Sequence, residues 1–416
     1  MAHLTIYLKK SLIMINTHKS NAGSTSIFSD ISTSAFIAGI VAIIVGYAGP
    51  TVIVFQVAEK AALTDAQIAS WLWSYSIGSA IVTIYASWKT RQPLIMAWST
   101  PGIAFLVFAL EGTEFSAAIG AFLVSNMLIF LIGLMGLFRK IMDSIPMSVA
   151  AALNAGILMP FALQAITGGQ SEPEIVVAMI VTFFVVRLFS ARWAVAAVLL
   201  VGLLACIILG KADFSELEFS LVVPVFTAPT FDLNSIINIS IPLTVLALTG
   251  QYLPGLAVVK SYGYKPKSDS IVKMCSVASI LSAPFGCHNI NPSSIIAGIV
   301  AGPEANSDPA KRYWAAIVAG FVYILFGTLA ASFVLLFLAL PSEAIMALAG
   351  LSLLAAIAHS LKTAIENEKE NIILPTVVLV VAISNFEILS IGSPFWAIVT
   401  GVVLSIAEHI KKKYDK

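Results

Sequence analysis

Long apolar segments follow one another along almost the whole chain and restrict it to a membrane protein. Hydrophobic residues make up 59% of the 416 residues and charged residues 11%, with a mean hydropathy of +0.95. A soluble domain does not need so much apolar surface, whereas each membrane-spanning helix needs about 20 apolar residues. The segments lie at 35–57, 66–87, 92–110, 115–137, 146–166, 174–190, 193–210, 236–259, 268–284, 285–301, 312–338, 342–361, 371–386 and 394–410. We predict an all-α polytopic membrane protein with 14 transmembrane segments, not all of them full spans.

The basic residues indicate how the chain is oriented. By this segmentation, all of the 23 lysines and arginines except Lys60 and Lys211 fall on one side of the membrane. Short loops rich in these residues stay in the cytoplasm, so that side is expected to be cytoplasmic. We therefore expect a multi-pass protein of the cell membrane, the inner membrane of a bacterium, with cytoplasmic tails at 1–34 and 411–416.

An internal duplication is predicted from the spacing of short motifs. The polar stretch 211–234 separates a first repeat of seven segments, 35–210, from a second, 235–410, and would be an extracytoplasmic linker. An odd number of spans in each half places the halves in opposite orientation. Three weak matches occur in the same order in both halves: Gly46–Pro50 with Gly250–Pro254, Thr100-Pro101 with Asn291-Pro292, and the stretch after Pro146 with that after Pro341.

The tenth segment contains a polar knot, His288-Asn289-Ile290-Asn291, just before Pro292. Asparagine suits an N-cap and proline the first helical position, so we expect extended backbone to Asn291 and then a helix of two to three turns. The third segment repeats this arrangement at Thr100-Pro101. Helices that begin inside the membrane present free N–H groups and a positive dipole end, and two such breaks indicate a midplane binding site. The alternative is a proline-kinked core helix.

An anionic substrate follows from the absence of charge at membrane depth. By this segmentation, every Lys, Arg, Asp and Glu falls in a loop or at a segment end. Two opposed helix ends would form a positive site without a fixed cation. Ser99, Asn289 or protonated His288 could add donors to the backbone N–H groups that follow Thr100 and Asn291. His288 could couple binding to protons because histidine titrates near neutrality, or it could be a neutral core histidine.

Aromatic and amide side chains would form the rest of the pocket. Tyr47 and Trp98 lie near the predicted breaks and favour a small organic anion over an inorganic one. Gln251 could bind substrate or only a neighbouring helix. For Asn126 and Asn154 we expect hydrogen bonds between helices. The sequence contains no phosphate-binding loop, metal-ligand spacing or catalytic triad, so we expect neither an enzyme nor a cofactor, and the net charge of +1 gives no reason to expect nucleic acid.

Four motifs together resemble the benzoate/proton symporter (BenE-type) family, which is similar in architecture to nucleobase permeases and sulfate/anion transporters. They are Leu63–Trp71, Ala97–Gly102, Gln251–Gly255 and Ala283–Asn291. The resemblance implies two inverted repeats of seven segments, with short broken helices in segments 3 and 10. It also implies a core domain of segments 1–4 and 8–11 and a gate domain of segments 5–7 and 12–14.

The resemblance also implies a binding site between segments 3 and 10. It makes Ser99, Thr100, Gln251, His288 and Asn291 site candidates, and Tyr47 follows by its position in segment 1. With Trp98 and Asn289 these form the predicted substrate-binding set, and His288 is the predicted proton-coupling residue. Cys287 and Asn289 depart from the family pattern, and Pro292-Ser293-Ser294 makes the start of the half-helix more polar, which would favour a different or more polar carboxylate.

The expected function is transport of a small aromatic carboxylate with protons, by alternating access of the core domain against the gate domain. The expected partners are the organic anion, protons and the lipid bilayer, and a homodimer is left open. A nucleobase or inorganic-anion permease of the same fold and an uncoupled anion channel are the alternatives.

Overall fold

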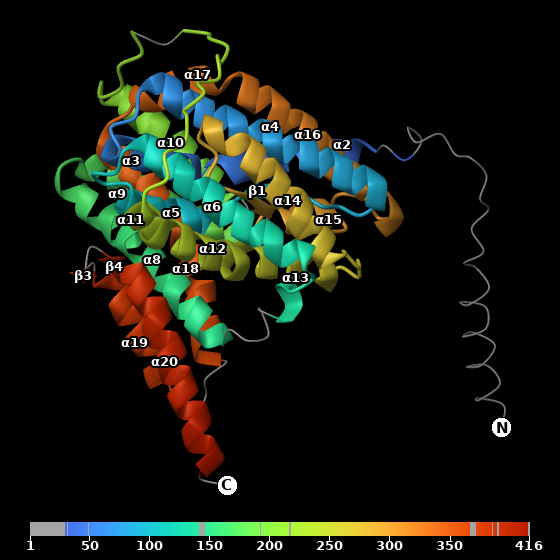
Figure 1. Ribbon diagram of the computed structural model, residues 1–416. Helices are drawn as coiled ribbons and strands as arrows, with labels where there is room; N and C mark the ends of the chain where they lie inside the picture. Colours follow the sequence, from blue (N-terminus) through green and yellow to red (C-terminus); the bar gives the residue numbers. More distant parts are fainter. Residues whose placement is uncertain are drawn as a thin grey trace, which may run out of the picture.

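The computed structural model describes residues 30, 32–48, 50–140, 146–191, 193–215, 218–366, 372–384, 386–388 and 391–414. Helices pack side by side in a bundle, and α19 and α20 extend from one end of it (Figure 1). Most of the expected tail at 1–34 lies outside the described residues. Helix α20 continues into the expected tail at 411–416 as far as Tyr414, and the cytoplasmic location of that tail stays a prediction.

Every predicted apolar segment contains at least one helix. The first half comprises α2 (Thr33–Ala48), α3 (Pro50–Lys60), α4 (Asp65–Thr90), β1 (Met96–Trp98), α5 (Thr100–Ala109), α6 (Phe115–Leu134), α8 (Met147–Thr167), η2 (Gly168–Gln170), α9 (Pro173–Phe189) and α10 (Ala194–Ile208). The second half comprises α11 (Leu233–Ser235), η3 (Ile236–Ser240), α12 (Ile241–Ala247), η4 (Leu248–Tyr252), α13 (Leu253–Ser261), α14 (Ser268–Ser282), η5 (Ala283–Phe285), β2 (Ile290–Pro292), α15 (Ala297–Ala301), η6 (Pro309–Lys311), α16 (Tyr313–Thr328), α17 (Ala330–Leu338), α18 (Ser342–Glu366), α19 (Ile373–Ile383), β3 (Glu387–Ile388), β4 (Ile391–Gly392) and α20 (Ser393–Tyr414).

The helices have the length and surface of a membrane protein. Among the described residues, five helical runs are long and apolar enough to cross a bilayer, and α16 with α17, bent by 62°, would make a sixth. Large apolar side chains such as Leu188 (82% exposed) and Phe189 (86% exposed) cover the outer surface, as expected where lipid replaces water. The chain is therefore a polytopic, mainly helical membrane protein. The count of 14 crossings, the inverted repeat and the core and gate domains remain predictions.

The two broken segments pair with each other, so the fold is not purely α-helical as predicted. Strand β1 runs antiparallel to β2, with Met96 opposite Pro292, Ala97 opposite Asn291 and Trp98 opposite Ile290. Extended backbone inside an apolar protein must find hydrogen-bonding partners, and each stretch supplies them to the other. The pairing joins residues that are almost 200 positions apart in the sequence. The label of β1 marks its place in the middle of the bundle (Figure 1).

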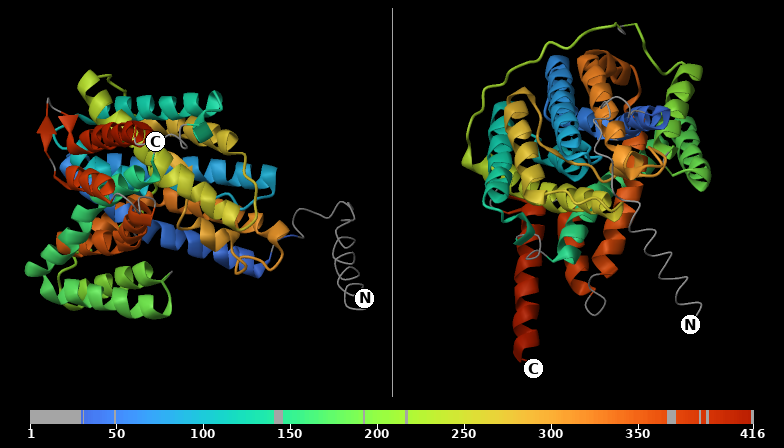
Figure 2. Two further views of the ribbon diagram at one scale, coloured as in Figure 1. Left: turned by 90° about the horizontal axis from the view of Figure 1, so that it is seen from below. Right: turned by 90° about the vertical axis from the view of Figure 1, so that its right-hand side faces the viewer.

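Residues 218–232 of the predicted linker run as an extended strap over one end of the bundle and lead into α11 (Figure 2). The Val225 N–H donates to Ser70 Oγ on α4 at 3.0 Å, and the Thr227 N–H donates to the Pro284 carbonyl at 2.8 Å. These bonds satisfy backbone groups that have no partner within the strap itself.

Replacing Gly255 with alanine is expected to destabilise the fold. A Cβ at this position would lie 2.3 Å from the Pro292 carbonyl oxygen, so β2 would have to shift. Overpacking of this kind costs about 1–3 kcal/mol, which should lower the thermal unfolding midpoint of the purified protein. Gly298→Ala is the matched control, because its Cβ would be 3.9 Å from the nearest atom. An unchanged midpoint for Gly255→Ala would show that the contact with β2 is unimportant.

Candidate functional site

Ser99 connects β1 to α5 and caps the helix. Its Oγ accepts a hydrogen bond from the Gly102 N–H at 3.0 Å, and its carbonyl accepts one from the Ile103 N–H at 2.8 Å. The cap is therefore one residue earlier than predicted. Pro101 has no N–H and that of Gly102 is already bonded, so the N–H and hydroxyl of Thr100 are the donors left at this helix start. Thr100 is only 6% exposed.

The second helix start is not where the sequence predicted it. Asn291 lies in β2 rather than at an N-cap, and α15 begins only at Ala297. The Ser293 N–H donates to the Ile95 carbonyl at 3.0 Å, which continues the strand pairing past Pro292. Ser293 Oγ then accepts from the Ile296 N–H at 3.4 Å, a local turn that competes with helix. The site consequently has one half-helix end, that of α5, rather than two facing ones.

Gly250 brings the eighth segment against the start of α5. A Cβ on Gly250 would lie 3.0 Å from Pro101 and 2.9 Å from the Asn154 amide nitrogen of α8. Gly250 belongs to η4, a short π-helical stretch, and such stretches often occur at functional sites. The neighbouring Gln251 is 6% exposed, and its side chain makes no hydrogen bond to the described part of the protein.

His288 lies two residues before β2, and its ring faces α4 and α6. Its ring is completely buried and packs edge-on against Trp71 of α4 and Phe122 of α6, with centroid distances of 5.8 and 6.2 Å. The ring lies near the backbone of Ser99, but neither nitrogen makes a well-formed hydrogen bond with a described residue. The main chain of His288, unlike its ring, is held by a hydrogen bond: Asn126 Nδ2 donates to the His288 carbonyl at 2.7 Å.

The two asparagines of the polar knot bond to each other. Asn291 Nδ2 donates to Asn289 Oδ1 at 2.9 Å. Both side chains are fully buried, and Asn289 Nδ2 and Asn291 Oδ1 have no partner among the described residues. One donor and one acceptor are therefore available next to the strand pair.

Tyr47 and Trp98 belong to a packed aromatic cluster. Tyr75 of α4 stacks on Trp98 at a centroid distance of 3.9 Å, and Tyr47 lies 5.5 Å from Trp98. The hydroxyls of Tyr47 and Ser76 are hydrogen-bonded, and the Tyr75 hydroxyl donates to that of Tyr323 at 2.7 Å. Trp98 is 2% exposed, so its ring packs mainly on other rings rather than facing an open pocket.

The structure thus places the predicted residues in three groups around the pair of strands β1 and β2. Ser99 and Thr100 lie at the start of α5, with Gln251 on η4 next to the Gly250 that contacts Pro101. His288, Asn289 and Asn291 lie on or beside β2, and Tyr47 and Trp98 lie in the aromatic cluster. Asn126 donates to the Phe122 carbonyl of its own helix and to the His288 carbonyl in the extended stretch, so the expected bond between two helices is not found, and Asn154 Oδ1 has no described partner. The sequence analysis gave Asn154 only a packing role, whereas the structure places it beside Gly250 and the start of α5. Its only signal was an amide inside an apolar segment.

Sequence comparison identifies close relatives. Residues 29–406 match the profile of a family described as BenE, benzoate membrane transport protein. The benzoate membrane transport protein of Acinetobacter baylyi is 37% identical over 375 residues, 90% of this chain and 95% of that protein. Inner membrane protein YdcO of Escherichia coli K12 is 34% identical over 380 residues, 91% of this chain and 97% of that protein.

Solved structures share the fold at much lower identity. The transmembrane domain of a cyanobacterium bicarbonate transporter, BicA, superposes with a TM-score of 0.58 at 13% identity, covering 89% of this chain and 97% of that one. The murine anion transporter Slc26a9 in its inward-facing state gives 0.58 at 12% identity, covering 97% and 75%. At this identity the likeness shows only the fold.

The profile covers most of the chain, and both curated relatives exceed 30% identity over nearly their full lengths. This chain therefore belongs to the benzoate membrane transport protein family, whose members are membrane transporters and not enzymes.

Proposed function

We propose that this protein carries a small aromatic carboxylate, such as benzoate, across the inner membrane together with protons. The observation that carries the proposal is the set of donors near the start of α5 that make no hydrogen bond with a described residue, in a chain of a benzoate transporter family. The Thr100 N–H and hydroxyl and the Gln251 amide could all donate to a carboxylate. The positive end of the α5 dipole adds to them without a fixed cation.

Burial supports alternating access. The candidate residues are all at least nine-tenths buried, so a substrate reaches them only if neighbouring helices separate. Asn154 of α8 belongs to the predicted gate domain, whereas Gly250 and Pro101 belong to the predicted core domain. The contact among these three residues is the place where movement of one domain would open the site.

His288 is the residue we assign to proton coupling. It lies near the Ser99 backbone and has no ion pair or hydrogen bond that would fix one protonation state. An arriving carboxylate would favour a proton on this ring, since opposite charges stabilise each other strongly in an apolar interior. Uptake should then depend on the pH on the side from which substrate enters.

Uptake into proteoliposomes tests the function directly. Labelled benzoate should accumulate when the outside is made acidic, and a protonophore should abolish accumulation without preventing equilibration. Unlabelled benzoate should compete, whereas uracil and sulfate should not. Stronger competition by uracil would support a nucleobase permease, and stronger competition by sulfate would support an inorganic-anion permease. Equilibration without accumulation would support an uncoupled channel.

Thr100→Val is expected to weaken benzoate binding about tenfold or more. Valine keeps the shape of the side chain but removes a hydroxyl that could donate to the carboxylate, and a hydrogen bond to a charged group contributes about 1.5–3 kcal/mol. Binding is measured as benzoate-dependent thermal stabilisation of purified protein. Thr182→Val on α9 is the control, because the Thr182 hydroxyl donates only within its own helix, to the Ala178 carbonyl. Equal affinity in the two variants would place the carboxylate elsewhere.

His288→Gln should flatten the pH profile of benzoate uptake. Glutamine cannot carry the proton, so the rate should lose its acid stimulation while benzoate still stabilises the protein at a single pH. The same measurement on Asn126→Ala separates coupling from packing, because this variant removes the bond to the His288 carbonyl and leaves the ring. A wild-type pH profile for His288→Gln would exclude this residue from coupling.

A further inference from the structure

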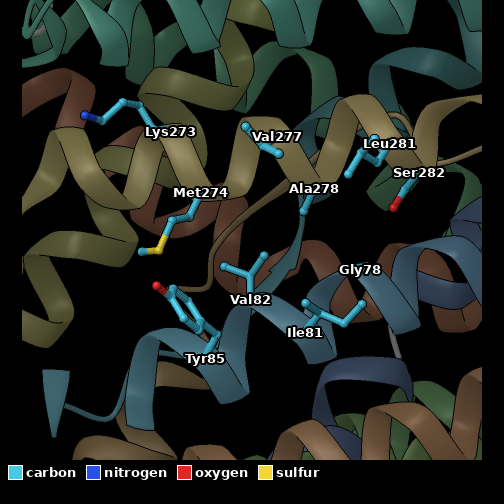
Figure 3. A pocket seen from close by; sticks show the side chains of 10 residues that line it. All are labelled: Gly78, Ile81, Val82, Tyr85, Lys273, Met274, Val277, Ala278, Leu281 and Ser282. Carbon is cyan, nitrogen blue, oxygen red and sulfur yellow. The ribbon is translucent and has the colours of Figure 1, made fainter. Parts of the chain in front are cut away.

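An open groove lies between α4 and α14 (Figure 3). It has a volume of about 380 Å³ and is lined by Gly78, Ile81, Val82, Tyr85, Lys273, Met274, Val277, Ala278, Leu281 and Ser282. Its outer rim is exposed, with Ile81 at 60% and Leu281 at 69%. Apart from Lys273, Tyr85 and Ser282, the lining is apolar, so the groove suits a hydrocarbon chain.

The groove continues into a second hollow of about 450 Å³, which shares Tyr85 and is lined also by Trp88, Lys89 and Arg91. From Gly78 to Lys89 the helix rises roughly 16 Å, about half of the hydrocarbon thickness of a bilayer. Trp88 (52% exposed) and Tyr85 (43%) lie at the end where the aromatic belt of a membrane protein is expected. One end of the groove thus lies at a membrane surface and the other near the midplane.

The surface end of the groove carries excess positive charge. Lys89 donates to the Tyr85 hydroxyl at 2.7 Å, and Arg91 bonds the Tyr313 hydroxyl and lies 3.7 Å from Asp30. Lys273, in contrast, makes no ion pair or hydrogen bond with the described residues. Asp269, one turn away on α14, does not pair with it.

The lysines at the opposite end of the bundle behave differently. Lys60 pairs with Glu111 at 3.3 Å and Lys211 with Glu172 at 2.9 Å. Other lysines of the described chain, such as Lys260, also make no ion pair, but Lys273 combines an unpaired ammonium with a place in the lining of the apolar groove. Its stem packs against Gly133 of α6, which leaves the charged end to reach the membrane surface.

We propose that this groove binds one anionic phospholipid of the cytoplasmic leaflet. One acyl chain lies along Ile81, Ala278 and Leu281 and ends at Gly78. The phosphate lies between Lys273 and Lys89, beside Trp88. Phosphatidylglycerol fits this chemistry, because its headgroup keeps the negative charge that a zwitterionic phosphatidylcholine headgroup balances internally. The leaflet follows from the expected orientation of the lysine-rich side.

The inner end of the groove adjoins the strand pair. A Cβ on Gly78 would lie 2.5 Å from Ile290 Cδ1 of β2 and 2.7 Å from Ser282 Oγ. Gly78 of α4 therefore lies between the end of the acyl chain and β2. The lipid would be a neighbour of the candidate site but would not enter it.

The test uses delipidated full-length protein in detergent, with binding of phosphatidylglycerol, phosphatidylcholine and inorganic phosphate followed by native mass spectrometry and thermal shift. Wild-type protein should bind phosphatidylglycerol about fivefold more tightly than phosphatidylcholine, and Lys273→Gln should lose that preference. Lys260→Gln, which changes an exposed lysine on the same side of the membrane but outside the groove, should keep it. Ala278→Phe, which fills the groove, should weaken the binding of both lipids.

Equal binding of the two lipids by wild-type protein would overturn the proposal, and so would an equal loss in Lys273→Gln and Lys260→Gln. Inorganic phosphate that competes as well as phosphatidylglycerol would mean that the acyl chain contributes nothing, which also overturns it. Should Ala278→Phe fail to fold, Leu281→Ala replaces it, because this side chain is 69% exposed and its loss leaves the core intact. Unchanged lipid binding in that variant would exclude the groove.

Discussion

The backbone of the two broken segments needs hydrogen-bonding partners in an interior that offers no water, and this need organises the centre of the protein. A helix satisfies its own peptide groups, but an extended stretch cannot. β1 and β2 satisfy each other, and the pairing continues through Ser293 to Ile95. Because one strand comes from each half of the chain, the pairing also fixes the two halves against each other at the point where the candidate site residues meet.

Side chains of neighbouring helices provide further hydrogen bonds to the backbone of this region. Ser279 of α14 accepts from the Ile290 N–H at 2.8 Å, Tyr252 of η4 donates to the Ile290 carbonyl at 3.2 Å, and Asn126 of α6 donates to the carbonyl of His288. Polar residues inside apolar segments are expensive unless they find such partners. Three of them here are explained by the backbone they support rather than by contact with a substrate.

The sequence predicted the positions of the helices and the family, but it did not predict how the breaks are built. Apolar length and the polar knot are local signals, and they correctly placed interruptions at the third and tenth segments. The strand pairing is a contact between residues almost 200 positions apart, and no local pattern contains it. For the same reason proline-based reasoning misplaced the second helix: it took no account of the Ser293 N–H, which bonds to Ile95 instead. Asn126 and Asn154 are alike in sequence and differ only in what packs against them.

Buried polar atoms without described partners beside β2 are what support the proposed binding site at the strand pair. His288, Asn289 Nδ2 and Asn291 Oδ1 are fully buried without partners among the described residues. A buried polar group without a hydrogen bond costs about 1–3 kcal/mol. The neighbouring Ile290 has partners for both its N–H and its carbonyl, so the cost falls on the side chains. A substrate that forms hydrogen bonds with these side chains would offset the free-energy cost of leaving them unpaired. A carboxylate alone can satisfy only the donors, so Asn291 Oδ1 needs a donor as well.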